Sequence, residues 1–538
     1  MLKKNFLKFA GMVLLAMGAI SSAQALSLST FTTTSKLANG HWVKIQIPES
    51  GVYEITYDEL RDMGFNNANS VRVYGCGGYM LSEVLDGSQP DDLVQVPVQR
   101  YGDKLCFYAK GPVSFSFTDL TSTSPHFSRT VNAYSQYGYY FLTENIGNEL
   151  SVNVSSATPS TGTIGHESSY DYTYHEAELT SLTLSGKNLL GEVIPAPDNF
   201  TLPYSLPNRE PGSPVTVTGC VAASISPNTP GITVSGYVKS YMNSDSERDT
   251  LSFTSSSSRI YSLSGQISYN YATPTATITP KRDQDNGTID FGVTCSSGTT
   301  GGTITRAYLD YCILTYLRQN VIGDDGQFRM NLLKVTPSDR IDLPNASQNL
   351  VVWNIDNESN PVQYNYSDYT GGSTPVKAFT PGYTKNWTQF VAFDPTMTLK
   401  KITAYEDVAN QNIHGLPSPD MVILTDKEYL EHAERLAQMH REHDNMIVHV
   451  VEQGQVFNEF SSGTPDAMAV RLMNKMFYDR NKTKFQNFLV LGCGSYDNRG
   501  LISNKPNRII TYQSDNSHDG DKTYVCDDFS KFVKINFT

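Results

Sequence analysis

The 538-residue sequence lacks the features that mark integral membrane, nucleic-acid-binding and zinc proteins. Beyond residue 25 no segment approaches about eighteen consecutive apolar residues, which excludes a transmembrane helix from the mature chain. The formal net charge is −13 and the lysines and arginines form no cluster, which argues against nucleic acid as a partner. The seven cysteines include no Cys-x-x-Cys pair and no zinc-finger spacing.

The nucleotide-binding signatures are missing as well. No Gly-x-Gly-x-x-Gly follows the first strand expected in the C-terminal segment, and there is no P-loop lysine, so a nucleotide-binding domain is the weakest interpretation.

Among the cysteines, Cys76, Cys106 and Cys312 lie in apolar strand-like runs that are typical of small buried hydrophobes. A disulfide between Cys220 and Cys295 is one pairing that an oxidising compartment allows.

The first 25 residues have the three parts of a secretory signal peptide. Lys3, Lys4 and Lys8 make a basic leader, residues 9–20 form a short apolar core, and Ala23-Gln-Ala25 suits signal peptidase. Their removal makes the chain still more acidic. We therefore expect an exported protein that is not integral to a membrane.

The composition favours a β-rich exported protein, because glycine, serine, threonine and tyrosine are plentiful while the charged fraction is only 18%. Residues 26–200 are dense in short strands and form the first expected domain. The runs 41–47 and 52–57, separated by a turn, predict a hairpin. A short helix is expected from Asp58, as its cap, to Gly64, and the aromatic run 137–142 predicts a central strand.

Residues 201–415 have a different composition, with expected strands separated by connections rich in proline, serine and threonine. Their spacing predicts a β-sandwich. The expected strands include residues 215–221, 232–238, 303–317 and 350–355. Leu416-Pro-Ser-Pro419 then marks the start of a third domain, residues 416–538.

The sequence pattern of the third domain predicts a parallel α/β fold. Short apolar strands alternate with segments of helical periodicity, an order that requires crossover connections and a sheet buried on both faces. The expected elements are strand 420–425, helix 426–443, strand 446–451, helix 465–478 and strand 487–491. Such sheets carry their chemistry beyond the carboxyl ends of the strands.

Several strings resemble gingipain-like cysteine peptidases, in particular the sortases of the type IX secretion system of Bacteroidetes. Their order and number carry the resemblance, which covers nearly all of the mature chain. The matching strings are Gly40–Ile45, Gly51–Tyr57, Val71–Gly75, Phe107–Pro112, Tyr139–Thr143, His175–Glu176, Ser185–Lys187, Gly191–Glu192, Ala307–Tyr311, Val352–Asp356, Val408–Leu416, Val456–Gly463 and Asp466–Arg471.

The resemblance implies a caspase-like α/β peptidase domain behind two β-rich, sandwich-like domains. It implies a protein at the outer membrane surface or in the periplasm that removes C-terminal sorting domains from secreted cargo. The new carboxyl end is then joined to anionic lipopolysaccharide through a thioester. An outer-membrane β-barrel is the implied docking partner, and calcium is the one cofactor that the family suggests.

The catalytic pair of that family is not found in this sequence. Thioester chemistry needs a thiolate and a nearby imidazole. The family places its histidine in a Gly-His-Gly turn and its cysteine after the next strand, both downstream of the Tyr524–Asp528 element. There is no Gly-His-Gly, and the pattern is lost after Asp528. The sequence therefore predicts a truncated, inactive sortase; the alternative is a non-catalytic exported surface or scaffold protein.

Two further sets of residues merit attention. Cys493 follows the third strand of the α/β domain and His518 lies on the next loop, so they have the residue types of a dyad; the alternative is a bystander thiol, because the family usually has Asp at this position. Asp497, Asp527 and Asp528 gather at the expected mouth of the sheet, where they would line the cleft or bind a cation such as calcium; acidic loops are more often simply solvated. His432, His440 and His443 share a helix with no carboxylate placed to complete a metal set.

Overall fold

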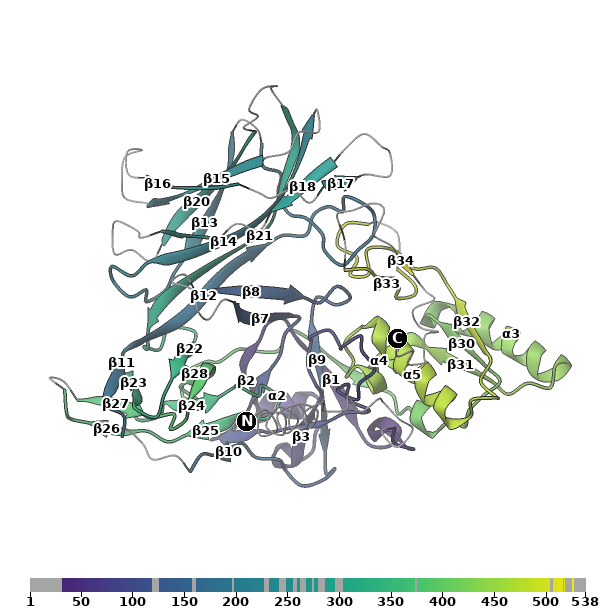
Figure 1. Ribbon diagram of the computed structural model, residues 1–538. Helices are drawn as coiled ribbons and strands as arrows, with labels where there is room; N and C mark the ends of the chain where they lie inside the picture. The colour runs from purple at the N-terminus through teal and green to yellow at the C-terminus, as the bar shows by residue number, and fades with distance from the viewer. Residues whose placement is uncertain are drawn as a thin grey trace, which may run out of the picture.

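The computed structural model describes most of the chain beyond residue 30 (Figure 1). The described residues are 31–118, 125–156, 161–195, 198–226, 232–240, 248–254, 259–261, 268–272, 275–278, 286–295, 303–372, 375–503, 507–515, 517 and 525–526. Strands dominate them, and none of their helices is long and apolar enough to cross a membrane.

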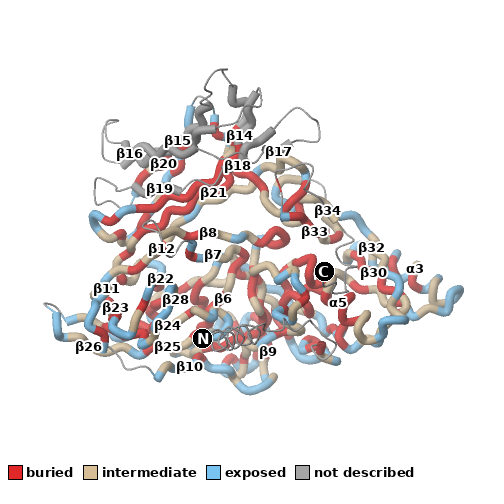
Figure 2. The backbone as a smooth tube through the Cα atoms, in the orientation of Figure 1, coloured by how far each residue is buried: buried red, intermediate tan, exposed pale blue. Residues whose placement is uncertain are grey.

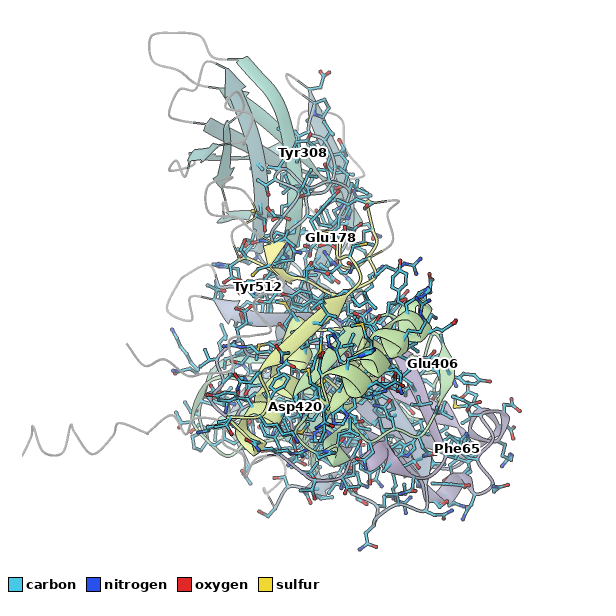
Figure 3. All side chains as sticks on the ribbon, turned by 90° about the vertical axis from the view of Figure 1, so that its right-hand side faces the viewer. Phe65, Glu178, Tyr308, Glu406, Asp420 and Tyr512 are labelled. Atoms are coloured by element: carbon cyan, nitrogen blue, oxygen red, sulfur yellow. The ribbon has the colours of Figure 1, made fainter. Side chains whose placement is uncertain are left out.

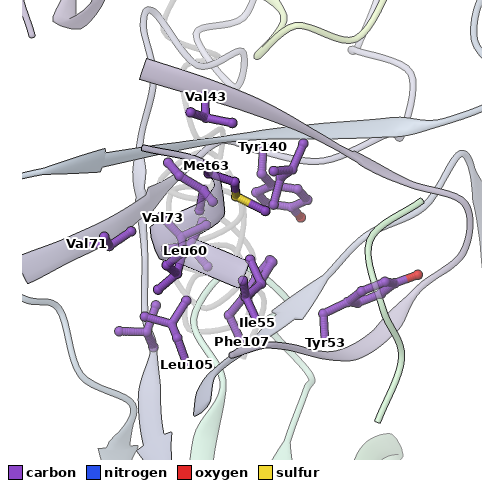
Figure 4. Close-up of a cluster of buried hydrophobic side chains, with 14 of the residues drawn as sticks. Val43, Tyr53, Ile55, Leu60, Met63, Val71, Val73, Leu105, Phe107 and Tyr140 are labelled. Carbon is purple, nitrogen blue, oxygen red and sulfur yellow. The ribbon is translucent and has the colours of Figure 1, made fainter. Parts of the chain in front are cut away.

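Two antiparallel sheets form a first sandwich. One has the order β29 (Tyr405–Val408), β1 (Trp42–Ile47), β9 (Gly138–Glu144), β3 (Val71–Tyr74), β4 (Gln95–Val96); the other has the order β2 (Gly51–Thr56), β6 (Lys104–Ala109), β5 (Gln99–Tyr101). Val43, Ile55, Leu105 and Phe107 meet in the core between them (Figure 4). The aromatic strand β9 is central in its sheet, as predicted.

The predicted hairpin between β1 and β2 is wrong. β1 pairs with β9 and β29, whereas β2 pairs with β6. The reason is that β2 is buried on both faces: Tyr53 packs toward the β1 sheet, while Val52 joins a second core with Trp353 and Phe393. Residues 48–50 therefore make a corner between two packed sheets, and the alternation in both strands reflects packing across a sandwich.

The short helix α2 (Tyr57–Asp62) is present, but its cap is Thr56 and not Asp58. Thr56 Oγ1 accepts the Glu59 amide, and the Glu59 carboxylate accepts the Thr56 amide at 2.6 Å. This reciprocal capping box satisfies two amides that the first helical turn leaves without partners. A threonine followed three residues later by glutamate was the sequence signal for it.

An eleven-stranded sheet forms the middle of the molecule. Its order is β10 (Asn153–Val154), β25 (Val362–Tyr364), β24 (Val351–Asn354), β28 (Lys385–Phe393), β22 (Gln327–Val335), β12 (Ser168–Glu176), β21 (Thr303–Gln319), β14 (Val215–Ser226), β18 (Ser268–Ala272), β17 (Arg259–Tyr261), with β19 (Thr275–Ile278) also on β14. Figure 2 shows the buried stretches of β14 and β21 side by side. By contrast, β12 and β22 are joined through one residue pair, Tyr170 and Asn331.

Smaller sheets cover this large one and confirm the predicted sandwich architecture. They are β13 (Asn199–Ser205), β20 (Asn286–Cys295), β15 (Ile232–Ser240), β16 (Arg248–Thr254); β11 (Ile164–His166), β23 (Asp339–Leu343), β27 (Val376–Phe379), β26 (Ser367–Tyr369); and the hairpin β7 (Val113–Thr118), β8 (His126–Val131). Phe291 packs with Val217, and Phe379 packs with Phe390. The large sheet takes strands from both sides of residue 200, and the domain boundaries stay predictions.

The α/β segment has the predicted parallel sheet, with β30 (Met421–Thr425) between β31 (Val448–Glu452) and β32 (Asn487–Leu491). Helix α3 (Leu430–His443) covers one face, and α4 (Gln453–Phe460) with α5 (Ala467–Arg480) covers the other. Each predicted strand and helix is present. Helix α4 is an addition that the sequence did not predict, since eight residues give a weak periodic signal.

A buried ion pair joins the α/β segment to the β-rich part. His414, in the 3₁₀ turn η5 (Ile413–Gly415), is fully buried, and its Nδ1 lies 2.6 Å from Oε2 of Glu459 on α4. Its Nε2 lies 3.1 Å from the Asp91 carboxylate, and its ring stacks on Phe460. Arg480, at the end of α5, donates to the carbonyls of Thr32, His414 and Leu416.

The charges around His414 keep it protonated. Burial alone would lower the pKa of the imidazole, but hydrogen bonds and charge from Asp91 and Glu459 outweigh burial and raise this pKa to about 9. The Glu459 carboxylate also accepts the amides of Ile413 and His414. Glu459 is thus fully engaged by one short stretch of chain, which sets the orientation of α4.

We expect His414→Phe to lower the free energy of unfolding by about 3–5 kcal/mol, because Glu459 would keep a buried charge without its partner. The matched control is His440→Phe: His440 lies 2.6 Å from Asp444 on the surface of α3, where such a pair contributes at most about 1 kcal/mol. Urea unfolding of both variants measures the difference. Equal losses in the two variants would contradict this role of His414.

The same pair makes stability depend on pH. The pKa of His414 is about 9 in the folded chain and 6.5 without its partners. Its stabilisation is therefore complete below pH 6.5 and is lost as pH rises through about 9. Unfolding curves between pH 6 and 10 should show the wild-type advantage over His414→Phe shrinking across that window. An advantage that stays constant would contradict the assigned protonation.

Candidate active site

The candidate active site is the carboxyl edge of the parallel sheet, where the three strands end in register. Thr425 of β30 lies beside Glu452 of β31 and Leu491 of β32, and Thr425 Oγ1 donates to the Leu491 carbonyl at 3.0 Å. Ligands and substrates of open α/β sheets bind beyond this edge.

Two carboxylates at this edge act as helix caps. Asp426 accepts the Glu428 amide at the start of the 3₁₀ turn η6 (Lys427–Tyr429). Glu452 accepts the amides of Gly454 and Gln455 at the start of α4. Both carboxylates satisfy backbone donors that helices leave unpaired, so their first role is structural.

After β32 the chain folds back over the carboxyl end of that strand. The Cys493 carbonyl accepts the amides of Arg508 and Ile509 at 3.0 and 3.2 Å. Gln453, the first residue of α4, donates to the Arg508 carbonyl and accepts the Ile510 amide. A side chain on Gly494 would collide with Thr511, so glycine is required for this close approach. Residues 508–511 therefore lie directly on the edge of the sheet.

Cys493 lies where the sequence placed it, immediately after β32, and its side chain is exposed without a disulfide. His518, the other half of the possible dyad, lies outside the described residues. Within the part of the chain that the structure describes, no histidine hydrogen-bonds to Cys493, and the dyad stays a prediction. Cys106 and Cys312 are fully buried, as predicted, whereas Cys76 is only partly so. Cys220 is buried, and the pairing with Cys295 stays a prediction.

Asp497 is the one acidic site candidate that the structure describes; Asp527 and Asp528 lie outside the described residues. Asp497 is buried, and its carboxylate accepts the amides of Leu501, Ile502 and Ser503 at 2.7–2.9 Å. The Asp497 carboxylate thus stabilises the loop that contains it. Its expected role, to line the cleft or to bind a cation, stays a prediction. Among the described residues no group of three His, Cys, Asp or Glu side chains is arranged to hold a metal ion.

Lys44 was missed by sequence reasoning. This residue of β1 lies with its Nζ 4.3 Å from the Tyr139 ring centre and 3.8 Å from Glu406. Burial lowers its pKa to about 8, although the charges of Glu406 and Glu452 act in the opposite direction. The first sandwich thus contributes a partly desolvated amine to the neighbourhood of the α4 cap. An alternating strand gives no sign of such a contact, because Glu452 is remote in sequence.

Comparison with known proteins gives these observations a context. Residues 414–535 match the model of peptidase family C25. A structure of dimeric latent PorU from Porphyromonas gingivalis superposes on 94% of this chain with a TM-score of 0.76 and 29% sequence identity. The chain is therefore similar to PorU over most of its length and to peptidase family C25 over its α/β segment. It spans 47% of that PorU chain, about half its length.

The remaining comparisons add nothing to the assignment. A VP2 subviral particle of infectious bursal disease virus aligns with 77% of this chain and 91% of its own at 8% identity, but the TM-score is only 0.18. No curated protein matches the chain. The PorU match confirms the fold class predicted from the sequence, a β-rich multi-sheet protein with a parallel α/β segment near the C-terminus.

We expect Cys493 to behave as an ordinary exposed thiol. A peptidyl inactivator of cysteine peptidases should modify it no faster than it modifies Cys526, since low-pKa catalytic thiols owe their reactivity to a neighbouring cation or imidazole. Mass spectrometry of timed samples measures both rates, with Cys493→Ser as the control. Selective modification of Cys493, about a hundredfold faster than Cys526, would instead establish an activated thiol.

Proposed function

We propose that this chain supplies the β-rich part and the first βα units of a PorU-type cysteine peptidase that acts as a sortase on exported proteins. The observation that carries the proposal is the PorU superposition over 94% of the chain. The family C25 match, which falls on the α/β segment, supports it independently.

The reaction we propose for the whole enzyme is acyl transfer. A thiolate attacks the peptide bond before the C-terminal sorting domain of a secreted cargo protein, and the sorting domain leaves with its amino group. The acyl group then passes from the thioester to a hydroxyl or amine of anionic lipopolysaccharide, or to water, and the carbon–sulfur bond breaks to release the thiolate. Backbone amides at the end of a parallel strand are suited to the oxyanion of such a step. The proposed location is the outer membrane surface, with a β-barrel partner.

The residues of this chain would build the frame of that site. The His414–Glu459 pair holds α4, and Gln453 at its start holds the loop that covers the carboxyl edge. We propose that these 538 residues alone do not turn over substrate. Support comes from the sequence, which has no Gly-His-Gly motif.

A non-catalytic exported scaffold is the second candidate function. The sandwich cores close with residues from the β-rich part alone, without a side chain from the parallel sheet. A β-rich part that folds on its own core can bind a partner without any peptidase activity. Capture of an outer-membrane β-barrel protein by the purified chain would favour this candidate when turnover is absent.

The test of the first proposal is incubation of the purified chain with a peptide that contains a cargo cleavage site. We expect no cleavage by the wild-type chain, and the same result for Cys493→Ser. Cleavage that disappears on alkylation and in Cys493→Ser would contradict the proposed inactivity and would make Cys493 the nucleophile. Cleavage that survives in Cys493→Ser would point to a contaminating peptidase, and repurification of that variant would show it.

A further inference from the structure

A seam runs between the β-rich part and the chain that follows β32. One side is the segment 178–188, which contains the Ser185–Lys187 string seen in the sequence. The other side is formed by Arg499 and by the segment 507–517 as far as the structure describes it. Figure 3 shows Glu178 and Tyr512 close to this seam. We refer to residues 178–188 as the latch and to the described part of 507–517 as the strap.

Backbone hydrogen bonds join the latch to the strap. The amides of Gly186, Lys187 and Asn188 donate in turn to the Gln513 side chain, the Ser514 carbonyl and the Ser517 hydroxyl, at 2.8–3.0 Å. Gly186 has a φ of +89°, and a Cβ there would lie 2.5 Å from Ser517 Cα. The close approach thus requires glycine, so this contact is built into the latch sequence.

Two basic side chains, Lys187 and Arg499, reinforce the seam with three ion pairs. Lys187 Nζ lies between the carboxylates of Asp515, at 2.6 Å, and Glu83, and Glu83 also accepts the Tyr512 hydroxyl. The guanidinium of Arg499 forms a two-point contact with the Glu178 carboxylate, and both side chains are largely buried. The Arg499–Glu178 pair is sensitive to removal of either partner, because the remaining charge stays desolvated, whereas Asp515 keeps its contact with water.

The strap connects the latch directly to the candidate active site. Its residues 508–510 hydrogen-bond to Cys493 and Gln453 at the carboxyl edge of the sheet. Gln513, Ser514 and Ser517 of the strap hydrogen-bond to the latch. Only a few residues separate the two sets of bonds. A movement of the latch is therefore transmitted to the carboxyl edge of the sheet through a short stretch of backbone that is hydrogen-bonded at both of its ends.

We propose that the latch positions the carboxyl edge of the peptidase segment, with Lys187 and Glu178 as the positioning residues. While the ion pairs of these two residues are intact, the strap lies against the backbone carbonyl of Cys493 and against α4. When the pairs are broken, the strap leaves the edge and opens it, while the β-rich sandwiches stay folded. The β-rich part then serves as more than a support, because it controls access to the edge. This inference concerns the conformation of the chain and holds whether or not the chain has activity.

The test is hydrogen exchange of the full chain, followed by mass spectrometry, for Lys187→Met, Glu178→Gln and Asp515→Asn. Asp515 is exposed, so its variant keeps the fold even where the other two are too unstable to purify. We expect exchange of peptides covering 186–188 and 508–513 to rise about tenfold or more, as for local opening, with β9 unchanged.

The matched control is Arg340→Met, which breaks an equally buried two-point pair with Asp342 inside β23. It should leave exchange at 186–188 and at 508–513 unchanged. The charge-swapped pair Glu178→Arg with Arg499→Glu should return exchange of both peptides toward the wild type. Unchanged exchange at 508–513 in the latch variants, or a rise that is uniform across the chain, would overturn the proposal. So would an equal response in Arg340→Met.

Discussion

The contact between His414 and Glu459 is the interaction on which the placement of the α/β segment depends. Both side chains are fully excluded from water, so each charge is tolerable only while the other is present. Apolar faces can slide over one another, but a buried pair with a short hydrogen bond allows one geometry. The pair therefore fixes the position of the C-terminal turn of α4, and α4 in turn holds the loop over the carboxyl edge through Gln453 at its start.

The same principle recurs at the other junctions. Arg480 links the end of α5 to three carbonyls of the β-rich part and the connecting segment, and Arg499 and Lys187 link the strap to the latch. Between its own elements the α/β segment is held by hydrophobic packing, as expected for a parallel sheet. Its outer contacts combine these polar links with apolar packing, in which Phe31 and Leu85 join the core of the α/β segment and Tyr134 packs with Ala467.

Local signals allowed much of the fold to be predicted from the sequence. The strands and helices of the α/β segment follow from periodicity within each element, and the carboxyl edge follows from the parallel order. The predicted hairpin of β1 and β2 is wrong because the pairing of β2 depends on packing against Trp353 and Phe393, which are some three hundred residues away. The buried ion pair of His414 could not be predicted for the same reason, since its carboxylate partners are 45 and 323 residues distant. The position of Cys493 was predictable; its environment was not.

The single residue pair between β12 and β22 has a mechanical consequence. β12 and β21, by contrast, share a continuous ladder from Ser168 with Gln319 to Glu176 with Tyr311. Between β12 and β22 side chains supplement the one bridge: Asn331 donates to the Tyr170 carbonyl, and Arg329 donates to the Asp171 carboxylate and the Tyr172 hydroxyl. The two halves of the large sheet are therefore joined mainly by side chains, so a substitution of Arg329 or Asn331 would weaken the sheet at this place more than a surface substitution elsewhere.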